Sequence, residues 1–330
     1  MRITVFSAKS YDRTMLEALC HRHGHTVVFV ESRLDMTTVR LAEGSAAVCL
    51  FVNDHADEGL LGQLSAAGVR GIALRCAGYN QIDLAAAQRF GIRVARVAAY
   101  APNAIAEHAV GLMLMLNRHL HRAYNRIREG NFALSGLLGF NLAGKTVAII
   151  GTGAIGTVTA RIMQGFGCVV LAHDLRPNPV LEAAGVTYVP FTTALATADI
   201  ISLHVPLHAS TTHLINRVAI SRFKSGAMLI NTSRGGLIDT EAVIEALKDG
   251  RIGALGLDVY EHESPLFFED HSDTPITDDL FSRLLTFPNV VITGHQAFFT
   301  REALVEIGET TVANLDAFAN NQPCSNDVSA

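Results

Sequence analysis

The sequence predicts an α/β protein with two domains, each built on a parallel sheet. One observation is the length, because 330 residues exceed the roughly 250 to 300 at which a single hydrophobic core stops growing. The other is a recurring pattern in which short runs of β-branched and apolar residues alternate with helical stretches. Strands that alternate with helices are typical of parallel sheets joined by right-handed crossovers.

The composition is that of a well-buried globular protein. Hydrophobic residues make up 49% of the chain and charged residues 17%, which excludes a disordered protein because enough apolar surface can be buried. Lys and Arg total 26 against 31 Asp and Glu, so the net charge is −5. This mild acidity gives no basic footprint for nucleic acid or an anionic membrane. The apolar runs are also shorter than the ~20 residues of a membrane helix.

Cysteine usage and the first residues both bear on location. Five cysteines are scattered, odd in number and never spaced as C-x-x-C, which favours reduced thiols in a cytosol. The first residues run directly into an apolar strand pattern. They lack the longer apolar region that a signal peptide has. We therefore expect a cytoplasmic protein.

The first hundred residues carry the first group of strands. We expect strands at 3–6, 26–30, 46–52, 71–74 and 93–97, the last of them weaker. One long helix is expected next, over 103–128, because apolar residues recur at helical spacing, among them Ile105, Ala109 and Leu112. Gly130 is expected to end this helix.

A second group of strands begins at Lys145. Six core strands are expected at 146–150, 169–173, 200–205, 227–231, 254–259 and 290–293. Helices are expected at 154–166 and 301–318. Six such strands make a complete Rossmann-type doubly wound parallel sheet, so the first group belongs to a second, smaller domain.

The strongest single motif is the Gly-Thr-Gly-Ala-Ile-Gly stretch between a predicted strand and a predicted helix. Gly151 permits a tight turn, Gly153 lets a pyrophosphate approach the backbone, and Gly156 lets helix and strand pack closely. Asp174 ends the next strand, where a carboxylate can bind a ribose hydroxyl and repel a 2′-phosphate. The motif predicts a site for NAD rather than NADP, although Arg176 leaves NADP open.

Polar residues follow the later strands, at the sheet edge where open α/β sheets bind ligands. Arg234, Glu263 and His295 come after three successive strands. Taken singly, each residue favours an ordinary interpretation: Arg234 as part of a surface ion pair, Glu263 as a solvated loop acid and His295 as a capped loop histidine. Together beside a nicotinamide site, they can bind a carboxylate and transfer a proton.

Over nearly its full length the sequence resembles the D-isomer-specific 2-hydroxyacid dehydrogenases. The stretches that carry the resemblance are 74–80 (LRCAGYN), 104–111 (AIAEHAVG), 151–156 (GTGAIG), 231–235 (NTSRG), 257–261 (LDVYE) and 294–298 (GHQAF). Within the family, 266–270 (LFFED) and 295–298 are similar to the bacterial fermentative D-lactate dehydrogenases. The wider family often has Pro directly after the catalytic Glu, whereas this sequence has Ser264. The exact geometry of the family's loop therefore carries over less directly to this chain.

The resemblance implies a domain organisation and an assembly. Residues 1–100 would form the first part of a substrate domain with a flavodoxin-like α/β fold, 101–298 the NAD-binding Rossmann domain, and 299–330 a return to the substrate domain. The family is usually dimeric or tetrameric, so a homodimer or homotetramer is expected.

The resemblance also implies a role for each site residue. His295 would give a proton to the keto oxygen as hydride arrives, Glu263 would orient its imidazole, and Arg234 would grip the substrate carboxylate. Substrate contacts are implied for Ala77, Gly78, Tyr100 and Phe298, with core packing equally open for the two aromatics. Besides Gly151, Gly153, Gly156 and Asp174, the residues implied around the dinucleotide are Ala154, Ile155, Val205, Pro206, Thr211, Thr232, Ser233 and Asp258.

The leading hypothesis is an NADH-dependent enzyme that reduces pyruvate to D-lactate. A dehydrogenase of another small 2-keto acid, such as glyoxylate, hydroxypyruvate or phenylpyruvate, remains an alternative. A non-catalytic, NAD(H)-sensing protein similar to a transcriptional corepressor is disfavoured by the complete Arg, Glu and His set.

Several histidines are interpreted as unrelated to the chemistry. His21, His23 and His25 lie where a helix passes into a strand, without acidic ligands nearby in sequence, so a solvated turn is favoured over a metal site. Glu107 and His108 are adjacent on a helix and do not face each other, so packing or subunit contact is expected.

Overall fold

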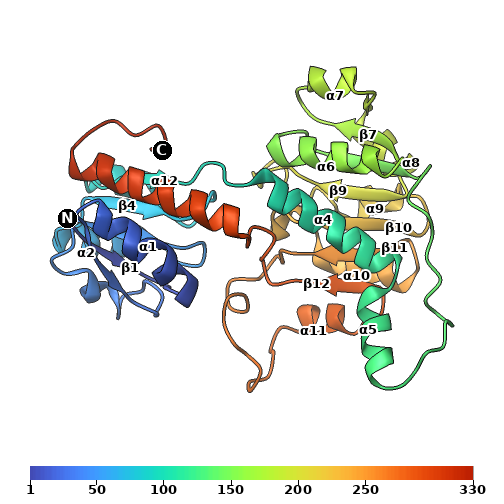
Figure 1. Ribbon diagram of the computed structural model, residues 1–330, viewed down its shortest axis with the longest axis horizontal. Coiled ribbons are helices and arrows are strands. Elements are labelled where there is room, and N and C mark those ends of the chain that lie inside the picture. Colours follow the sequence, from blue (N-terminus) through green and yellow to red (C-terminus); the bar gives the residue numbers. More distant parts are fainter. Residues whose placement is uncertain (330) are drawn as a thin grey trace. The chain divides into compact units, whose positions relative to one another are not determined.

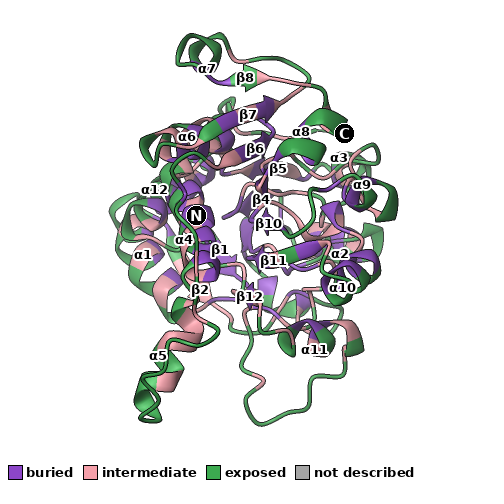
Figure 2. Cartoon of the chain, turned by 90° about the vertical axis from the view of Figure 1, so that its right-hand side faces the viewer, coloured by how far each residue is buried: buried purple, intermediate pink, exposed green. Residues whose placement is uncertain are grey.

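The computed structural model describes residues 1–329 and divides into two compact units. Unit 1 comprises Met1–Ala101 and the residues from Phe299 on, and unit 2 comprises Pro102–Phe298. Figure 1 shows a sheet with covering helices in each unit. Buried residues concentrate on the strands and on the inward faces of the helices (Figure 2).

Unit 1 is a five-stranded parallel sheet in the order β2-β1-β3-β4-β5, the strand order of flavodoxin-like folds. Its strands are β1 (Arg2–Val5), β2 (Thr26–Phe29), β3 (Ala47–Leu50), β4 (Gly71–Leu74) and β5 (Arg93–Arg96). Its helices are α1 (Ser10–Arg22), α2 (Glu58–Ala66), α3 (Leu84–Arg89) and α12 (Arg301–Ala319), with a 3-10 turn at Val39–Ala42.

The returning helix α12 packs beside α1 on one face of the unit 1 sheet (Figure 1). Val312 and Leu315 of α12 share an apolar cluster with Leu16 of α1 and Ile3 of β1. Gly308 permits the close approach, because a Cβ there would lie 2.7 Å from Cγ of Met15. The other face is covered by α2 and α3. The C-terminal segment is thereby an integral part of unit 1.

Unit 2 is a seven-stranded parallel sheet in the order β12-β11-β10-β9-β6-β7-β8. Its strands are β6 (Thr146–Ile150), β7 (Val169–His173), β8 (Thr187–Tyr188), β9 (Ile200–Leu203), β10 (Ala227–Asn231), β11 (Ile252–Leu257) and β12 (Val290–Ile292). The order reverses between β6 and β9, and ligands bind at such a switch point in a Rossmann-type sheet. The two-residue strand β8 was missed in the sequence, because so short a strand has no readable alternation.

The helices of unit 2 cover both faces of its sheet. They are α4 (Pro102–Asn117), α5 (Leu120–Arg128), α6 (Ala154–Gly165), α7 (Pro179–Ala183), α8 (Phe191–Thr197), α9 (Arg217–Ser221), α10 (Thr240–Lys248) and α11 (Asp279–Leu285), with a 3-10 turn at Gly235–Leu237. Helices α4 and α6 share one apolar cluster with the sheet, and α8 to α11 lie in the cluster of the opposite face.

The single helix predicted over 103–128 is wrong, because the chain breaks into α4 and α5. His119 has a φ of +51°, in the left-handed region, and separates the two helices. The buried Asn117 side chain donates to the carbonyl oxygen of Phe140 at 2.8 Å and accepts from its amide at 2.9 Å. These two hydrogen bonds hold the end of α4 to a distant segment, which sequence periodicity does not reveal.

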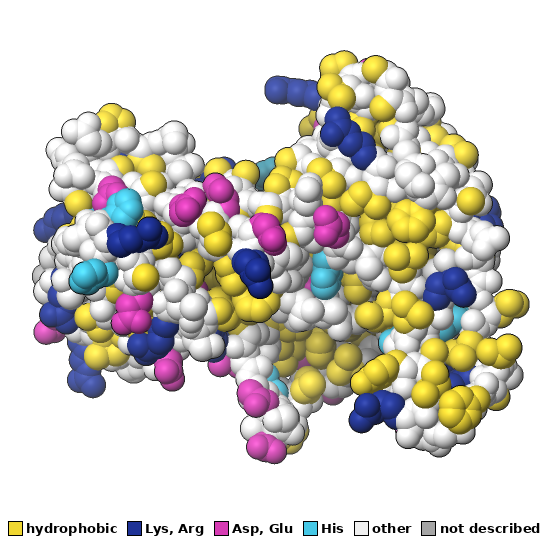
Figure 3. Space-filling view, viewed as in Figure 1, with side chains coloured by type: hydrophobic (Ala, Val, Ile, Leu, Met, Phe, Trp, Pro, Cys, Tyr) yellow, Lys and Arg dark blue, Asp and Glu magenta, His cyan; other side chains and the backbone are white. Residues whose placement is uncertain are grey.

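Helix α5 buries no residue within unit 2. Figure 3 shows hydrophobic side chains gathered over α5 and the segment that follows it. Gly130 ends this helix with a φ of +74°, as predicted. No helix of residues 1–329 is long and apolar enough to cross a membrane.

Candidate active site

The glycine turn of unit 2 joins β6 to α6. Gly151 has a φ of +94°, and a Cβ on Gly156 would collide with the Gly151 carbonyl oxygen, so both positions exclude other residues. A Cβ on Gly153 would instead meet nothing within 4 Å. The amides of Ala154 and Ile155 open α6 and, within the described chain, donate to no acceptor. Open space before free helix N-terminal amides fits a phosphate group.

Asp174 follows β7 and faces this turn. Its Oδ2 accepts from the Thr152 amide at 2.6 Å, and its Oδ1 accepts from the Arg176 amide at 3.0 Å. Burial by itself raises the pKa of Asp174, but these hydrogen bonds outweigh burial and the pKa lies below its usual value. A fixed, ionised carboxylate is therefore present at the position predicted for a ribose contact.

The switch point is lined by residues that follow β9 and β10. Thr232 is 7% exposed, and its buried Oγ1 has no hydrogen-bond partner within residues 1–329, so it can bond to a ligand that binds here. Ser233 Oγ donates to the Leu203 carbonyl at 2.7 Å. Pro206 is exposed, and its carbonyl accepts from Thr211 Oγ1 at 2.8 Å.

His204 lies beside Gly151 at the end of β9. Its Nε2 lies 2.9 Å from Ser202 Oγ, and its carbonyl leaves no space for a Cβ on Gly151. Burial lowers the pKa of His204 to about 4, so its ring is neutral near neutral pH. The half-buried Val205 follows it, and its side chain also closes against Gly151. The residues present thus fit a dinucleotide at this switch point.

Arg234 stands after β10 in a turn closed by Asn231. The Asn231 side chain donates to the Arg234 carbonyl at 2.8 Å and accepts from the Ser233 amide at 3.0 Å. Gly235 follows, and a Cβ there would collide with the backbone of Tyr260. The turn that carries Arg234 therefore packs directly against the loop that leads to the predicted acid.

Glu263 and His295 are brought into direct contact. His295 Nδ1 lies 2.8 Å from Glu263 Oε1, and Oε2 of the same carboxylate accepts from the Tyr260 amide at 2.9 Å. The two side chains are 16% and 17% exposed. With Nδ1 committed to the carboxylate, Nε2 is the ring nitrogen left to exchange a proton. His295 has a φ of +54°, an uncommon backbone conformation that aims the ring.

Asp258, predicted to contact the dinucleotide, uses both carboxylate oxygens on the loop that carries His295. Its Oδ1 accepts from Thr293 Oγ1 at 2.5 Å and from the Gln296 amide at 2.9 Å. Its Oδ2 accepts from the Ala297 amide at 2.8 Å. Burial by itself raises the pKa of this carboxyl, but the hydrogen bonds from His108, Thr293 and two backbone amides outweigh it, so the pKa is lowered.

Packing or subunit contact was expected for the helix of His108, and the structure adds specific polar contacts that the sequence did not predict. Its Nε2 lies 2.9 Å from Thr293 Oγ1 and 3.4 Å from Asp258 Oδ1. The contact forms because α4 packs against β11 and β12, which is a tertiary arrangement. No spacing in the sequence indicates it.

A second pair that the sequence did not single out braces the loop of Glu263. His213 Nε2 lies 2.5 Å from Glu261 Oε1, and Glu261 Oε2 accepts from Thr240 Oγ1 at 2.8 Å. Burial raises the pKa of Glu261, but the hydrogen bonds from His213 and Thr240 prevail and lower it. An ionised Glu261 thereby ties together the loop after β9, the start of α10 and the loop after β11.

In unit 1 the loop after β4 rests on a buried arginine. Arg75 is 2% exposed, and its Nε donates to Asp12 Oδ1 at 2.9 Å. Arg96 donates to the Ala77 carbonyl at 2.8 Å. Within residues 1–329 the amides of Ala77 and Gly78 donate to no acceptor, so both are available to a ligand. Of the two predicted aromatics, Tyr100 is half-buried in unit 1 and Phe298 is buried in unit 2.

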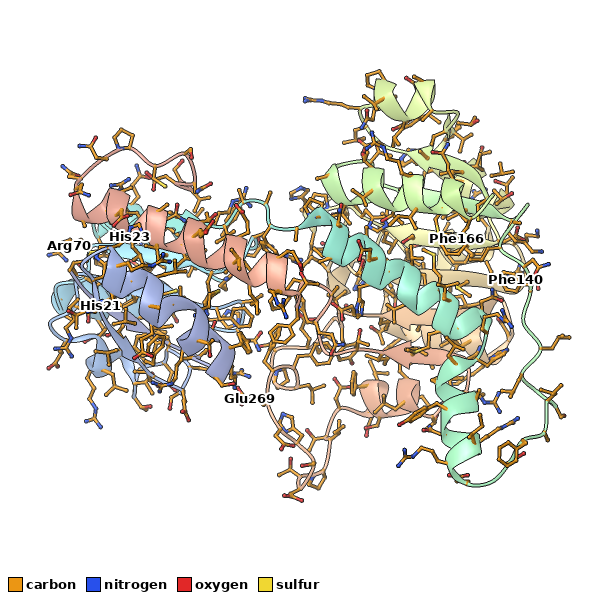
Figure 4. The ribbon with its side chains drawn as sticks, in the orientation of Figure 1. His21, His23, Arg70, Phe140, Phe166 and Glu269 are labelled. Carbon is orange, nitrogen blue, oxygen red and sulfur yellow. The ribbon has the colours of Figure 1, made fainter. Side chains whose placement is uncertain are left out.

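The solvated turn predicted for the histidines at 21–25 is correct for His21 and His23, which are exposed, and wrong for His25, which is buried. His23 Nδ1 lies 2.6 Å from Asp316 Oδ2, and His25 Nε2 lies 2.9 Å from Asp316 Oδ1. Figure 4 labels His21 and His23 at the end of α1, where α12 lies beside it. The acidic partner comes from the returning helix, almost three hundred residues away in sequence. Within residues 1–329, no group of three or more His, Cys, Asp or Glu is placed to hold a metal ion.

Comparisons with known proteins agree with the fold and the glycine turn. Residues 110–297 match the family model described as the D-isomer specific 2-hydroxyacid dehydrogenase, NAD binding domain. D-lactate dehydrogenase of Escherichia coli is 48% identical, with 99% of this chain and 100% of that protein covered. D-lactate dehydrogenase kk1H of Curvularia clavata is 52% identical over 99% of this chain and 94% of its own length.

A solved structure described as the pyruvate reductase of Chlamydomonas reinhardtii superposes with a TM-score of 0.94 at 47% identity, covering 99% of this chain and 98% of that one. These relatives extend over both units. The glycine turn and the NAD-binding family model together give a cofactor of the NAD type. The chain therefore belongs to the D-isomer-specific 2-hydroxyacid dehydrogenases, a family of NAD-dependent enzymes.

Proposed function

We propose that the protein is a D-lactate dehydrogenase that reduces pyruvate with NADH. The observation that carries the proposal is the 2.8 Å contact between His295 Nδ1 and Glu263 Oε1, which leaves the other ring nitrogen for a substrate oxygen. The names of two relatives as D-lactate dehydrogenases and of a third as a pyruvate reductase support lactate and pyruvate as the substrate pair.

His295 is the proton donor in this proposal. Its Nε2 gives a proton to the keto oxygen, and the Glu263 carboxylate stabilises the protonated imidazole before transfer and orients the ring. Arg234 holds the substrate carboxylate with its planar guanidinium. In unit 1, the free amides of Ala77 and Gly78 are further candidate donors to a ligand carboxylate.

The cofactor proposed is NAD rather than NADP. When bound, it supplies the hydride that becomes the new C–H bond of lactate. The backbone at Gly153 and the first amides of α6 would hold the pyrophosphate of the cofactor. The buried Thr232 hydroxyl would form a hydrogen bond to the cofactor. Asp174 is ionised and fixed, so it accepts from a ribose hydroxyl and repels a 2′-phosphate.

A steady-state assay tests the function. NADH oxidation is measured with pyruvate, glyoxylate, hydroxypyruvate and phenylpyruvate, each also with NADPH. We expect pyruvate and NADH to give the highest kcat/KM. A preference for another 2-keto acid would replace lactate with that substrate, and NADH binding without any turnover would instead favour a sensor protein.

We further propose that the chain forms a homo-oligomer through α5 and the segment after it. Large apolar side chains are exposed there, including Phe132 (75%), Leu134 (83%) and Leu138 (91%). Such contiguous apolar exposure is typical of a protein interface, and a second copy of this chain presents the same self-complementary surface. Equilibrium sedimentation of the wild type and of Leu134→Asp/Leu138→Asp should show a dimer or tetramer that dissociates in the variant. A monomeric wild type would contradict the proposal.

A cytoplasmic location is also proposed. All five cysteines are free thiols in the structure, and burial raises the pKa of Cys20 to about 11 and of Cys49 to about 12. Thiols of this kind suit a reducing compartment.

A further inference from the structure

A second hydrogen-bond chain, separate from the contact with Glu263, reaches the loop that carries His295. His108 Nε2 lies 2.9 Å from Thr293 Oγ1, and Thr293 Oγ1 lies 2.5 Å from Asp258 Oδ1. The three residues come from α4, from the end of β12 and from the end of β11. The side chain of Asp258 is 1% exposed and that of His108 is 21% exposed.

The proton positions in this chain follow from donor counting. Asp258 has a lowered pKa and is an acceptor only, so the single Thr293 hydroxyl proton points to its Oδ1. The Thr293 oxygen is then an acceptor toward His108, whose Nε2 must carry the hydrogen. His108 is thereby the outermost donor of a directed chain that ends on a buried charge.

The same buried charge holds the turn that presents His295. The amides of Gln296 and Ala297 donate to the two Asp258 carboxylate oxygens, and the His295 amide donates to the Asp258 carbonyl at 2.7 Å. A left-handed φ at a residue with a Cβ persists only where its surroundings fix it. Asp258 therefore supplies three of the contacts that hold His295 in its +54° conformation.

We propose that His108 is a positioning residue for the proton donor. Its Nε2–H fixes the Thr293 hydroxyl, and this hydroxyl in turn fixes the Asp258 carboxylate that holds the His295 turn. His108 acts through Thr293 and Asp258, and within residues 1–329 it forms no hydrogen bond or ion pair with Glu263 or the His295 ring. The inference deepens the proposed dehydrogenase function and rests on it for its kinetic test. Its structural test is independent of turnover.

The variants separate a donated hydrogen bond from simple packing. His108→Leu keeps bulk and removes the donor, whereas His108→Gln keeps a neutral N–H near the same position. Thr293→Val removes the bridging hydroxyl at nearly constant volume. Glu107→Gln is the matched control, because Glu107 neighbours His108 on α4, is exposed and has no part in the chain.

For the kinetic test we expect His108→Leu to lower kcat by about tenfold or more, while KM for pyruvate changes by less than about threefold. His108→Gln should recover most of the loss, and Glu107→Gln should match the wild type. The His108→Leu/Thr293→Val double variant should be no slower than either single variant, because both break one chain. Equal losses in His108→Gln and His108→Leu, or multiplicative losses in the double variant, would overturn the proposal.

A second measurement keeps the inference separate from the function. The Nδ1 proton of His295 shared with Glu263 should give a downfield proton NMR signal in the NADH-bound protein. We expect the signal to broaden or move in His108→Leu and to persist in His108→Gln and Glu107→Gln. An unchanged signal in His108→Leu would overturn the positioning role. A wild type that turns over no 2-keto acid would refute the proposed function instead, and the NMR comparison would still decide the inference.

Discussion

His295 and Asp258 are joined backbone to backbone, with the His295 amide 2.7 Å from the Asp258 carbonyl, while the His295 ring contacts a different carboxylate, Glu263, at 2.8 Å. The two acids thus hold different parts of one histidine. Asp258 holds the peptide chain that presents the ring, and Glu263 holds the ring itself. This division follows from the adjacent parallel strands β11 and β12, whose carboxyl ends bring Asp258 and the 293–297 turn together.

Removing the charge of Glu263 should weaken the proton donor directly. In Glu263→Gln the amide still reaches Nδ1 but no longer stabilises a protonated ring, so we expect kcat to fall by about 10². Stopped-flow measurement of NADH oxidation in a single turnover checks this, with circular dichroism as the control for folding. A kcat within about twofold of the wild type would remove Glu263 from the reaction.

Replacing Arg234 by Lys should damage both binding and turnover. A point charge cannot replace the bidentate fork, so we expect KM for pyruvate to rise and kcat to fall, each by about tenfold. Arg222→Lys is the control, because Arg222 is an exposed arginine of the same unit. If the two lysine variants behave alike in steady-state kinetics, Arg234 does not bind the substrate.

Cofactor choice should depend on the charge of Asp174. Its lowered pKa means that the carboxylate stays ionised across the neutral range and repels a 2′-phosphate there. We expect Asp174→Asn to raise the Kd of NADH and to narrow the NADH/NADPH preference by about tenfold, with Arg176 then able to meet the phosphate. Fluorescence titration with both cofactors measures this. An unaltered preference would show that selectivity lies elsewhere.

The partly buried His204 should make the protein sensitive to mild acid. Its folded pKa of about 4 lies below the ordinary value of 6.5, so the unfolded chain takes up the proton first as pH falls. His204 therefore contributes stability above pH 6.5 that is lost as pH falls toward 4, by up to about 3 kcal/mol. Urea unfolding of the wild type and His204→Gln across that range should give a shallower pH dependence in the variant. The same pH dependence of the unfolding free energy in both proteins would contradict this role of His204.

The sequence was sufficient to predict features that depend on local backbone and side-chain chemistry. The turn at Gly151 can be predicted because its tight backbone accepts glycine only, and most strands of both sheets lie within a few residues of their predicted ranges. The placement of Arg234, Glu263 and His295 after successive strands could be read from the alternation of strands and helices.

The sequence was insufficient where distant segments meet. The break between α4 and α5 depends on Asn117 bonding to Phe140, and the contact of His108 with Thr293 depends on how α4 crosses the sheet. Asp316 meets His23 only because α12 returns to unit 1. Such contacts are set by tertiary packing, and no spacing or propensity in the chain encodes them visibly.

The handedness of the product tests the central claim most directly. Purified protein is given pyruvate and NADH, and the lactate formed is separated on a chiral column. We predict D-lactate alone, at a rate that depends on His295 and is lost in His295→Gln. Formation of L-lactate, or no lactate from a folded protein that binds NADH, would contradict the function proposed for this site.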